Sequence, residues 1–244
     1  MFTSIMGGKK VDINVANDNI TQEISNLSPK VYSKVLNERK IYVFMKRVVD
    51  IIGAVFGIIL LAPITLGIFI AKIVCKDKGS IIYTQNRIGK NGKIFKMYKF
   101  RSMVEGADEI LEEYLAQNDE AREEYKINKK LKDDPRITRI GKFIRKTSID
   151  EFPQFINVFK GDMSLVGPRP YLEKEKDDIG GYYPYITAVK PGITGLWQVS
   201  GRNDVPFEER LNLDEEYYEK KSVTMDLKIL VKTATKVFSR EGAI

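Results

Sequence analysis

The most distinctive pattern in the chain is a run of 21 residues without a charged side chain, from Ile51 to Ala71, in which Thr65 carries the only hydroxyl group. At about 1.5 Å per residue a straight helix of this length would extend ~31 Å, which is enough to cross the hydrocarbon core of a bilayer. The run therefore favours a membrane helix over a helix buried in a soluble domain.

Two features argue against a simple crossing. Pro63 lies inside the run, where it removes a backbone hydrogen bond and kinks the helix. Basic residues flank both ends, with Lys46 and Arg47 before the run and Lys72 after it, whereas a spanning helix normally shows a basic bias on its cytoplasmic side only. Two forms stay open: a single-pass anchor with a kink, and a re-entrant helix that turns near Pro63 and returns to the same face.

Shorter patterns predict the remaining elements. Residues 1–40 are polar without sustained periodicity, which predicts a loosely ordered tail. Asn91-Gly92 supplies a hairpin turn, and apolar residues after Ile149 recur at helical spacing until Gly161. The expected strands are Ile81–Ile88 and Ile94–Phe100, and the expected helices are Glu105–Lys130, Ile149 to before Gly161, Phe207–Lys221 and Met225–Phe238.

The last of these helices is amphipathic. Leu227, Leu230 and Val231 lie on one side, and Lys228 and Lys232 lie on the other. Such a helix can rest on a bilayer with its lysines among the headgroups. It can equally pack its apolar side against the protein's own core, and the pattern does not separate the two arrangements.

Composition narrows the chemistry that the chain can perform. Its 244 residues include no His and a single Cys. This excludes Ser-His-Asp and Cys-His nucleophile pairs, His-ligated zinc and an internal disulfide. Catalysis must then depend on carboxylates, Lys, Arg, Tyr, Ser or Thr, with or without a hard metal ion that prefers oxygen ligands.

The net charge of +7 is concentrated in one block. Between Lys76 and Arg101 eight basic residues accompany one acidic residue, so this basic block equals the whole surplus. Such a block binds phosphate, whether of nucleic acid, anionic lipid or a phosphorylated substrate. It can also be a solvated strand edge that lysines protect from aggregation. Beside a membrane helix, headgroups or a phosphorylated substrate are favoured over nucleic acid.

The strongest candidate for chemistry is the pair Asp150-Glu151. One explanation is structural, because Ser148 followed three residues later by Glu151 has the pattern of a capping box. The other is that carboxylates at a helix N-terminus meet a phosphoryl group, whose charge Arg145 and Gly167-Pro168-Arg169-Pro170 help to neutralise. In that case Asp150 is the expected nucleophile and metal ligand, and Glu151 orients or deprotonates the second substrate.

Two loops are candidates for holding substrate. Prolines on both sides of Arg169 fix the backbone, which limits the conformational entropy lost when its guanidinium binds a phosphate. The segment from Lys190 to Arg202 is glycine-rich and contains the only Trp, Trp197. This side chain could stack on a sugar or a base, or it could be an interfacial anchor.

The order of these motifs resembles the bacterial sugar transferases, which are the monotopic polyprenyl-phosphate phosphoglycosyl transferases. The likeness extends over roughly Lys46 to Phe238, with Phe152 a mild departure where family members often have Leu. The segments that carry it are Lys46-Arg47 before the apolar run with Pro63, Lys99-Phe100-Arg101-Ser102-Met103, Asp134-Pro135-Arg136-Ile137-Thr138, Arg145 with Ser148-Ile149-Asp150-Glu151-Phe152-Pro153-Gln154, Gly167-Pro168-Arg169-Pro170, and the loop from Lys190 to Arg202.

The resemblance implies transfer of a sugar-1-phosphate from a UDP-sugar to polyprenyl (undecaprenyl) phosphate with release of UMP, as the first step of exopolysaccharide, capsule, O-antigen or glycan assembly. It implies that Asp150 takes up the phosphosugar covalently, that Mg²⁺ binds at Asp150, that Glu151 assists the polyprenyl phosphate and that the apolar helix is re-entrant and broken at Pro63. The residues expected to bind substrate or phosphate are Arg145, Arg169, Arg101, Arg136, Lys99, Gln154 and Arg202.

The predicted fold is therefore α+β and mostly helical, with an N-terminal re-entrant membrane helix broken at a proline, a small β-hairpin and amphipathic surface helices. Its parts are the tail (1–40), the membrane helix with its flanks (41–80) and a catalytic domain (81–244) on the cytoplasmic face of the bacterial inner membrane. The expected partners are a UDP-sugar, polyprenyl phosphate and membrane lipids, with a homodimer left open and no nucleic acid. The alternative is a non-catalytic membrane-anchored scaffold whose basic block binds anionic lipid.

Overall fold

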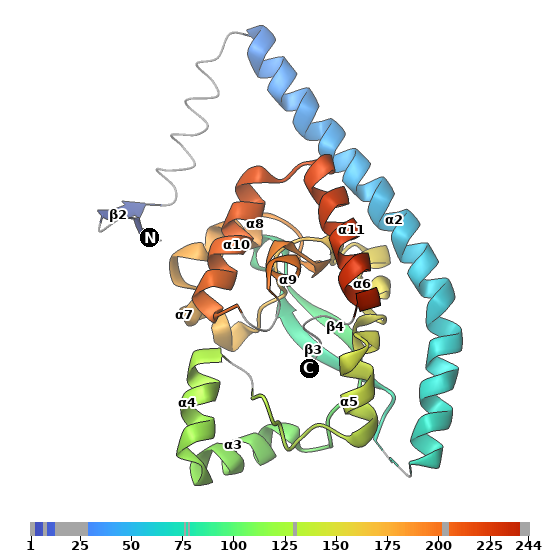
Figure 1. Cartoon of the computed structure of the whole chain (residues 1–244). Coiled ribbons are helices and arrows are strands. Elements are labelled where there is room, and N and C mark those ends of the chain that lie inside the picture. The colour runs from blue at the N-terminus through green and yellow to red at the C-terminus, as the bar shows by residue number, and fades with distance from the viewer. Residues whose placement is uncertain are drawn as a thin grey trace.

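The computed structural model describes residues 3–6, 9–12, 29–75, 77, 79–128, 131–201 and 205–239, with side chains between 40 and 236. It is mostly helical with a small antiparallel hairpin at its centre, as the sequence predicts (Figure 1). The longer helices are α2 (Pro29–Val74), α3 (Ala107–Gln117), α4 (Asp119–Asn128), α5 (Arg139–Lys146), α6 (Gln154–Lys160), α10 (Phe207–Lys220) and α11 (Val223–Ser239).

The strands form three separate pairs. These are β1 (Thr3–Met6) with β2 (Lys9–Asp12), β3 (Ile82–Ile88) with β4 (Ile94–Phe100), and β5 (Ser164–Val166) with β6 (Gly192–Thr194). The first two pairs are antiparallel and the third is parallel. Short helical segments connect them: η1 (Lys90–Gly92), η2 (Ile149–Glu151), η3 (Glu173–Glu175), α7 (Lys176–Ile179), η4 (Gly180–Tyr182), α8 (Tyr183–Ala188) and α9 (Leu196–Ser200).

Helix α2 differs from the broken helix that the resemblance implies. It is one helix of 46 residues that begins inside the expected tail and continues through Pro63, and Figure 1 shows it curving along one side of the domain. A proline withholds one N–H group, here the donor to the carbonyl of Ile59, and helices in an apolar setting tolerate this loss. The Thr65 hydroxyl, two residues later, donates to the carbonyl of Leu61 at 2.7 Å. The helix passes the proline without ending.

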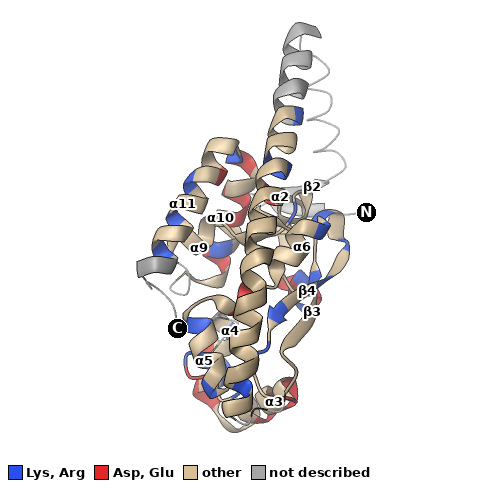
Figure 2. Ribbon diagram, turned by 90° about the vertical axis from the view of Figure 1, so that its right-hand side faces the viewer, with Lys and Arg blue, Asp and Glu red and all other residues tan. Residues whose placement is uncertain are grey.

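One side of α2 is uncovered and apolar. The part from Lys40 to Val74 is long and apolar enough to cross a membrane, and only 17% of its most apolar window is buried. Figure 2 shows this uncharged part as a tan rod on the face turned to the viewer. Its most exposed large side chains include Ile52, Phe56, Ile59, Leu66, Phe69, Ile70 and Ile73. A continuous apolar surface of this kind marks an interaction site, and its length and composition fit lipid.

The opposite side of α2 is attached to the domain by polar groups. The Lys46 ammonium donates to the carbonyl of Val166 at 2.9 Å and to the carboxylate of Asp226 at 2.8 Å. Arg47 donates to two carbonyl groups in the last turn of α6. Asp50, one turn further on, accepts two hydrogen bonds of 2.8 Å from β5. The bases before the apolar run thus bind the protein itself, which their sequence position did not predict.

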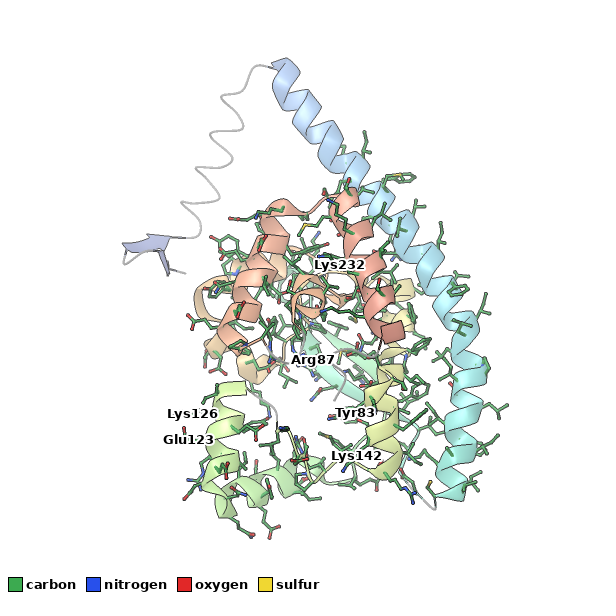
Figure 3. The ribbon with its side chains drawn as sticks, in the orientation of Figure 1. Tyr83, Arg87, Glu123, Lys126, Lys142 and Lys232 are labelled. Carbon is green, nitrogen blue, oxygen red and sulfur yellow. The ribbon has the colours of Figure 1, made fainter. Side chains whose placement is uncertain are left out.

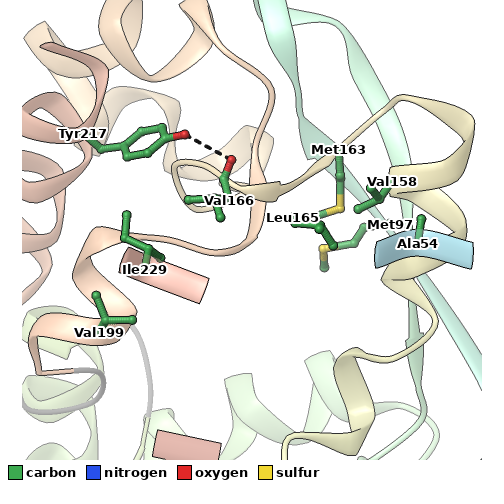
Figure 4. Close-up of a cluster of buried hydrophobic side chains, with 9 residues drawn as sticks. All are labelled: Ala54, Met97, Val158, Met163, Leu165, Val166, Val199, Tyr217 and Ile229. Carbon is green, nitrogen blue, oxygen red and sulfur yellow. Dashed lines mark hydrogen bonds between the residues drawn. The ribbon is translucent and has the colours of Figure 1, made fainter. Parts of the chain in front are cut away.

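Two glycines let the domain approach the α2 backbone closely. A Cβ atom at Gly53 would collide with Leu165, and one at Gly57 would collide with the ring of Phe155. Small residues spaced one turn apart permit such contact between packed elements. Ala54, between the two glycines, belongs to the main core cluster, which is completed by Met97, Val158, Met163, Leu165, Val166, Val199, Tyr217 and Ile229 (Figure 4).

The predicted hairpin is confirmed, and its turn has the expected chemistry. Asn91 and Gly92 have φ angles of 58° and 73°, a left-handed conformation that Asn and Gly adopt most readily. On the outer edge of β4, the fully buried Asn157 of α6 accepts from the N–H of Tyr98 at 3.0 Å and donates to the carbonyl of Lys96 at 2.7 Å. This amide fixes α6 against the hairpin and so places the end of β4 beside η2.

The expected helix over Glu105–Lys130 is in fact two helices, α3 and α4, which meet at Asn118. The side-chain oxygen of Asn118 accepts from the N–H of Ala121 at 3.0 Å, and Asn in this position begins a helix. The two helices and the following segment share a small apolar cluster of their own around Leu111, Ala121 and Leu131. Figure 1 shows them at the lower end of the molecule.

Helix α11 contacts the core along one side and is open on another. Ile229 is 2% exposed within the main core cluster, and the hydroxyl of Thr233 lies 2.7 Å from that of Thr194. Leu227 and Val231 are 49% and 66% exposed. The core thus contacts a side of α11, containing Ile229 and Thr233, that the sequence pattern did not identify, with Leu230 at its edge. Leu227 and Val231 of the predicted apolar side face away from the core, and their contact with a bilayer stays a prediction.

Replacing Lys46 by Met is expected to destabilise the protein by about 3 kcal/mol. The change leaves the Asp226 carboxylate, whose side chain is 10% exposed, without its ammonium partner, and breaking a buried pair on one side typically costs ~3–5 kcal/mol. Chemical unfolding in detergent micelles measures the difference. Lys220→Met is the matched control, because Lys220 pairs with Glu216 at 2.9 Å on the exposed face of α10. Equal unfolding midpoints for both variants would contradict the assignment.

Candidate active site

A cavity of about 1380 Å³ opens between the hairpin, η2, the Gly167–Pro170 turn and the α3–α4 segment. Its wall contains every predicted catalytic and substrate-binding residue that the structure describes: Asp150, Glu151, Lys99, Arg101, Arg136, Arg145, Gln154 and Arg169. Arg202 lies outside the described residues. In Figure 3 the labelled Tyr83 and Arg87 of the hairpin and Lys142 of α5, which also line this cavity, lie around the centre of the molecule.

Asp150 lies in a short turn rather than in the first turn of a long helix. Segment η2 has three residues, and α6 begins only after Pro153, which has no N–H group to offer. Ser148 has a left-handed backbone with φ of 55° and its side chain does not cap the turn, so the capping box is not formed. The expected phosphate site at a helix N-terminus is therefore absent from this turn, and anion binding falls to side chains.

The two carboxylates share one ammonium group. Lys99, at the end of β4, places its Nζ 3.8 Å from Oδ2 of Asp150 and 3.3 Å from Oε1 of Glu151. Burial raises the pKa of the Asp150 carboxyl above its ordinary value, while the nearby Lys99 charge acts to lower it. Glu151 is more exposed, with 39% of its side chain accessible against 12% for Asp150. The dyad thus presents one sheltered and one accessible carboxylate to the cavity.

Arg145 approaches the dyad from α5. Its Nε donates to the Ser102 hydroxyl at 2.8 Å. Burial lowers its pKa, and the charge of Asp150 is the largest influence in the opposite direction. Helix α5 can approach Ser102 this closely because residue 141 is a glycine, where a Cβ atom would collide with the carbonyl of Ser102. The guanidinium of Arg145 is therefore held near the Asp150 carboxylate by a neutral hydroxyl.

The remaining arginines of the wall are not equivalent. Arg136 is buried and forms a two-pronged pair with Asp134, with N–O distances of 2.8 and 2.7 Å. Arg101 pairs with the exposed Glu105 at 3.0 Å. Carboxylates of the chain thus already balance these two guanidinium groups. Arg169, in contrast, is half-buried at the cavity wall, where its guanidinium carbon lies 5.7 Å from the centre of the Trp197 ring.

Trp197 does not have either role that the sequence suggested. It is 7% exposed, and the guanidinium groups of Arg169 and Arg210 lie 5.7 and 5.3 Å from its ring centre. A ring covered by cations is not free to stack on a sugar or base, and a buried ring cannot anchor in the membrane interface. Trp197 is instead a platform for the two arginines, because α9 and α10 pack together behind the Gly167–Pro170 turn.

Sequence reasoning missed the group behind Arg169. The carboxylate of Asp214, on α10, accepts from the Arg169 N–H at 3.2 Å and from the Tyr171 hydroxyl at 2.8 Å. It is completely buried, and burial raises its pKa to about 7. The Arg87 guanidinium, predicted only as part of the basic block, donates to the carbonyl of Pro170 at 2.9 Å. No local motif marks Asp214, since it lies far along the chain from the turn that it contacts.

The dyad has the donors that a magnesium ion uses when it binds together with a substrate. Within the part of the chain that the structure describes, no three His, Cys, Asp or Glu side chains gather into a metal site. Mg²⁺ is commonly held through one or two carboxylates together with substrate phosphates and water. Asp150 and Glu151 offer that number of ligands. The residues therefore fit Mg²⁺ bound with a phosphorylated substrate, and they do not fit an ion held by protein ligands alone.

Comparison with known proteins gives a match along most of the chain. The family model described as bacterial sugar transferase matches residues 41–240. Undecaprenyl-phosphate galactose phosphotransferase of Salmonella typhimurium is 48% identical over 200 residues, which are 82% of this chain and 42% of that protein. UDP-glucose:undecaprenyl-phosphate glucose-1-phosphate transferase of Escherichia coli is 38% identical over 208 residues, with 82% and 41% covered.

A shorter relative matches along most of its own length as well. Exopolysaccharide production protein ExoY of Rhizobium meliloti is 41% identical over 198 residues, which are 81% of this chain and 87% of that protein. The chain spans less than half the length of the Salmonella and Escherichia relatives. The family model and these identities together establish that the chain belongs to the bacterial sugar transferase family.

Proposed function

We propose that this chain transfers a sugar-1-phosphate from a UDP-sugar to polyprenyl phosphate and releases UMP. The observation that carries the proposal is the Asp150-Glu151 dyad with Lys99 in the wall of a cavity that also contains Arg145 and Arg169. The names of the Salmonella and Escherichia relatives support the substrate class, because both are described as acting on undecaprenyl phosphate. The cavity volume of about 1380 Å³ exceeds the ~300–1,000 Å³ of ordinary ligand pockets and leaves room for two phosphorylated substrates.

In the first step an oxygen of the Asp150 carboxylate attacks the β-phosphorus of the UDP-sugar. The bond between that phosphorus and the bridging oxygen breaks, so UMP leaves with the oxygen and an acyl-phosphate joins Asp150 to the sugar phosphate. Arg145 and Arg169 are the side chains placed to balance charge on the phosphate oxygens. The Lys99 charge favours the ionised, nucleophilic form of Asp150 and so acts against the effect of burial.

In the second step an oxygen of polyprenyl phosphate attacks the same phosphorus. The acyl-phosphate bond breaks, which regenerates the Asp150 carboxylate and forms a polyprenyl diphosphate sugar. Glu151 is the more exposed carboxylate of the dyad and accepts the proton of a singly protonated phosphate. Bound Mg²⁺ would supply further positive charge to the phosphate oxygens, with Asp150 as its protein ligand.

The contacts of α2 with the domain support an attachment in which both ends of the helix lie at one face of the bilayer. The helix contacts the domain from Lys46, which binds Val166, to Ile68, which packs with Phe100 and Ile144. If α2 crossed the bilayer, β5, α6 and α5 would have to follow it into hydrocarbon, where their polar groups lack water. We therefore propose that both ends of α2 lie at the cytoplasmic face of the bacterial plasma membrane, which is the side where nucleotide sugars are made.

Replacing Asp150 by Asn is expected to reduce UMP release from a UDP-sugar by more than about a thousandfold, because an amide cannot form the acyl-phosphate. Purified protein with polyprenyl phosphate and a panel of UDP-sugars provides the assay and also identifies the preferred sugar. Asp177→Asn, at an exposed acidic position outside the cavity, is the matched control. An active Asp150→Asn variant would exclude the covalent step, and a wild-type protein without activity on any sugar would favour the scaffold.

Chelation of divalent ions with EDTA is expected to stop UMP release, because the metal ion supplies positive charge to the phosphate oxygens, whereas the two carboxylates of the dyad are themselves negative. Added Mg²⁺ should restore the rate to its starting value. The measurement is the initial rate of UMP formation before and after addition of the metal. Full turnover in EDTA would show that the arginines and Lys99 are sufficient.

A membrane-impermeant maleimide is expected to label both ends of α2 from the cytoplasmic side only. The single native cysteine, Cys75, is exposed at the C-terminal end, and Lys40→Cys in a Cys75→Ser background places one at an exposed position before the apolar run. Lys40 is preferable to Lys46, because Lys46 is engaged by Val166 and Asp226. Labelling of the two sites from opposite sides would mean that α2 spans the bilayer.

A further inference from the structure

The turn that contains Arg169 is held from behind by one carboxylate. Oδ2 of Asp214 accepts both the backbone N–H of Arg169, at 3.2 Å, and the hydroxyl of Tyr171, at 2.8 Å. Tyr171 is also completely buried. The main chain at Arg169 and the side chain two residues later are thus fixed to the same atom of α10.

The opposite side of the turn is held by strand β3. Nη1 of Arg87 donates to the carbonyl of Pro170 at 2.9 Å, and the N–H of Ile88 donates to the carbonyl of Tyr171 at 2.9 Å. The residue before Arg169 and the residue after it are both prolines, which have fixed φ angles. The backbone around Arg169 is therefore constrained from two elements that are distant in sequence.

This constrained backbone carries the Arg169 side chain. The guanidinium lies over Trp197, which Arg210 also contacts, at the wall of the cavity. Asp214 lies on α10, one helical turn beyond Arg210.

Burial of the Asp214 carboxylate costs free energy of folding. Within the described part of the chain, its second oxygen, Oδ1, is buried without a hydrogen-bond partner. An unsatisfied buried carboxylate oxygen normally destabilises a fold. Burial also raises the pKa of Asp214 to about 7, while hydrogen bonds from Tyr171 and Arg169 and the charges of Arg169 and Arg210 act to lower it.

We propose that Asp214 is a positioning residue for Arg169. It holds the backbone N–H of Arg169 and the hydroxyl of Tyr171 so that the Arg169 guanidinium stands on Trp197 and faces the cavity, where it binds a phosphate of the nucleotide sugar. The role in substrate binding rests on the proposed function, whereas the position of the guanidinium does not.

The position of Arg169 can be measured without substrate, because Trp197 is the only Trp in the chain. Its fluorescence emission responds to the cations over the ring. Asp214→Ala removes the acceptor for both donors and is expected to shift the emission. Asp214→Asn is expected to retain most of the wild-type emission, since one amide oxygen can accept both hydrogen bonds. Tyr182→Phe is the matched control, because its hydroxyl bonds Asn212 of the same helix at 2.6 Å in an exposed position.

Kinetics with a UDP-sugar provide the second readout. Asp214→Ala is expected to raise KM about tenfold with a smaller change in kcat. A tenfold rise is the size of effect expected when one hydrogen bond, neutral or charge-assisted, is lost. Arg169→Lys should produce a similar rise in KM. Adding Asp214→Ala to Arg169→Lys should then have little further effect, because both changes act on one interaction.

The outcomes separate this proposal from the proposed function. A folded Asp214→Ala variant with wild-type emission and wild-type KM overturns the positioning role. If Asp214→Ala does not fold, Asp214→Asn decides, and a shifted emission in that variant overturns the role, because its amide oxygen can still accept both hydrogen bonds. Absence of UMP release from the wild-type protein refutes the proposed function alone, because the emission of Trp197 still reports whether Asp214 positions Arg169.

Discussion

The carbonyl oxygen of Val166 is the atom at which the main parts of the molecule meet. It accepts from the Lys46 ammonium of α2 at 2.9 Å and from the Tyr217 hydroxyl of α10 at 3.3 Å. The next residue begins the Gly167–Pro170 turn in the cavity wall. The apolar helix, the C-terminal helices and the wall of the candidate active site are therefore joined within a few ångströms. Movement of α2 away from the domain would break the Lys46 hydrogen bond to the residue that directly precedes the turn.

Pairing between basic and acidic side chains allows many charged residues to lie around one cavity. The basic block does not act as one surface. Lys99 is bound by the dyad and Arg87 is buried against Pro170, whereas Lys90, Lys93 and Lys96 remain exposed. In the same cavity, Asp134 compensates Arg136 and Asp214 lies behind Arg169. Only some of the basic side chains in the cavity wall therefore remain available to bind a substrate phosphate.

Membrane attachment and chemistry are linked through the same packing. Gly53 and Gly57 allow β5 and α6 to lie directly on α2, and α6 follows immediately after the dyad. The exposed apolar side of α2 is turned away from these contacts (Figure 2). A lipid-linked phosphate that reaches the cavity would therefore meet a dyad held at a fixed height relative to the apolar helix. This geometry suits a substrate with a long apolar tail and a charged head.

Local patterns in the sequence determined the features that depend on a few neighbouring residues: the apolar run, the turn at Asn91-Gly92, the end of α6 at Gly161 and the adjacent carboxylates of the dyad. Other features needed the tertiary structure, because their partners lie far apart in the chain. From the sequence Lys46 is only a basic flank of the apolar run, and the structure shows that it binds Asp226. Trp197 was expected to be available for stacking, but Arg169 and Arg210 cover its ring. Asp214 carries no motif, since its environment is created by the burial of α10 against a distant turn. Backbone propensity and spacing act over one or two turns, whereas burial and charge pairing are decided by which surfaces pack together.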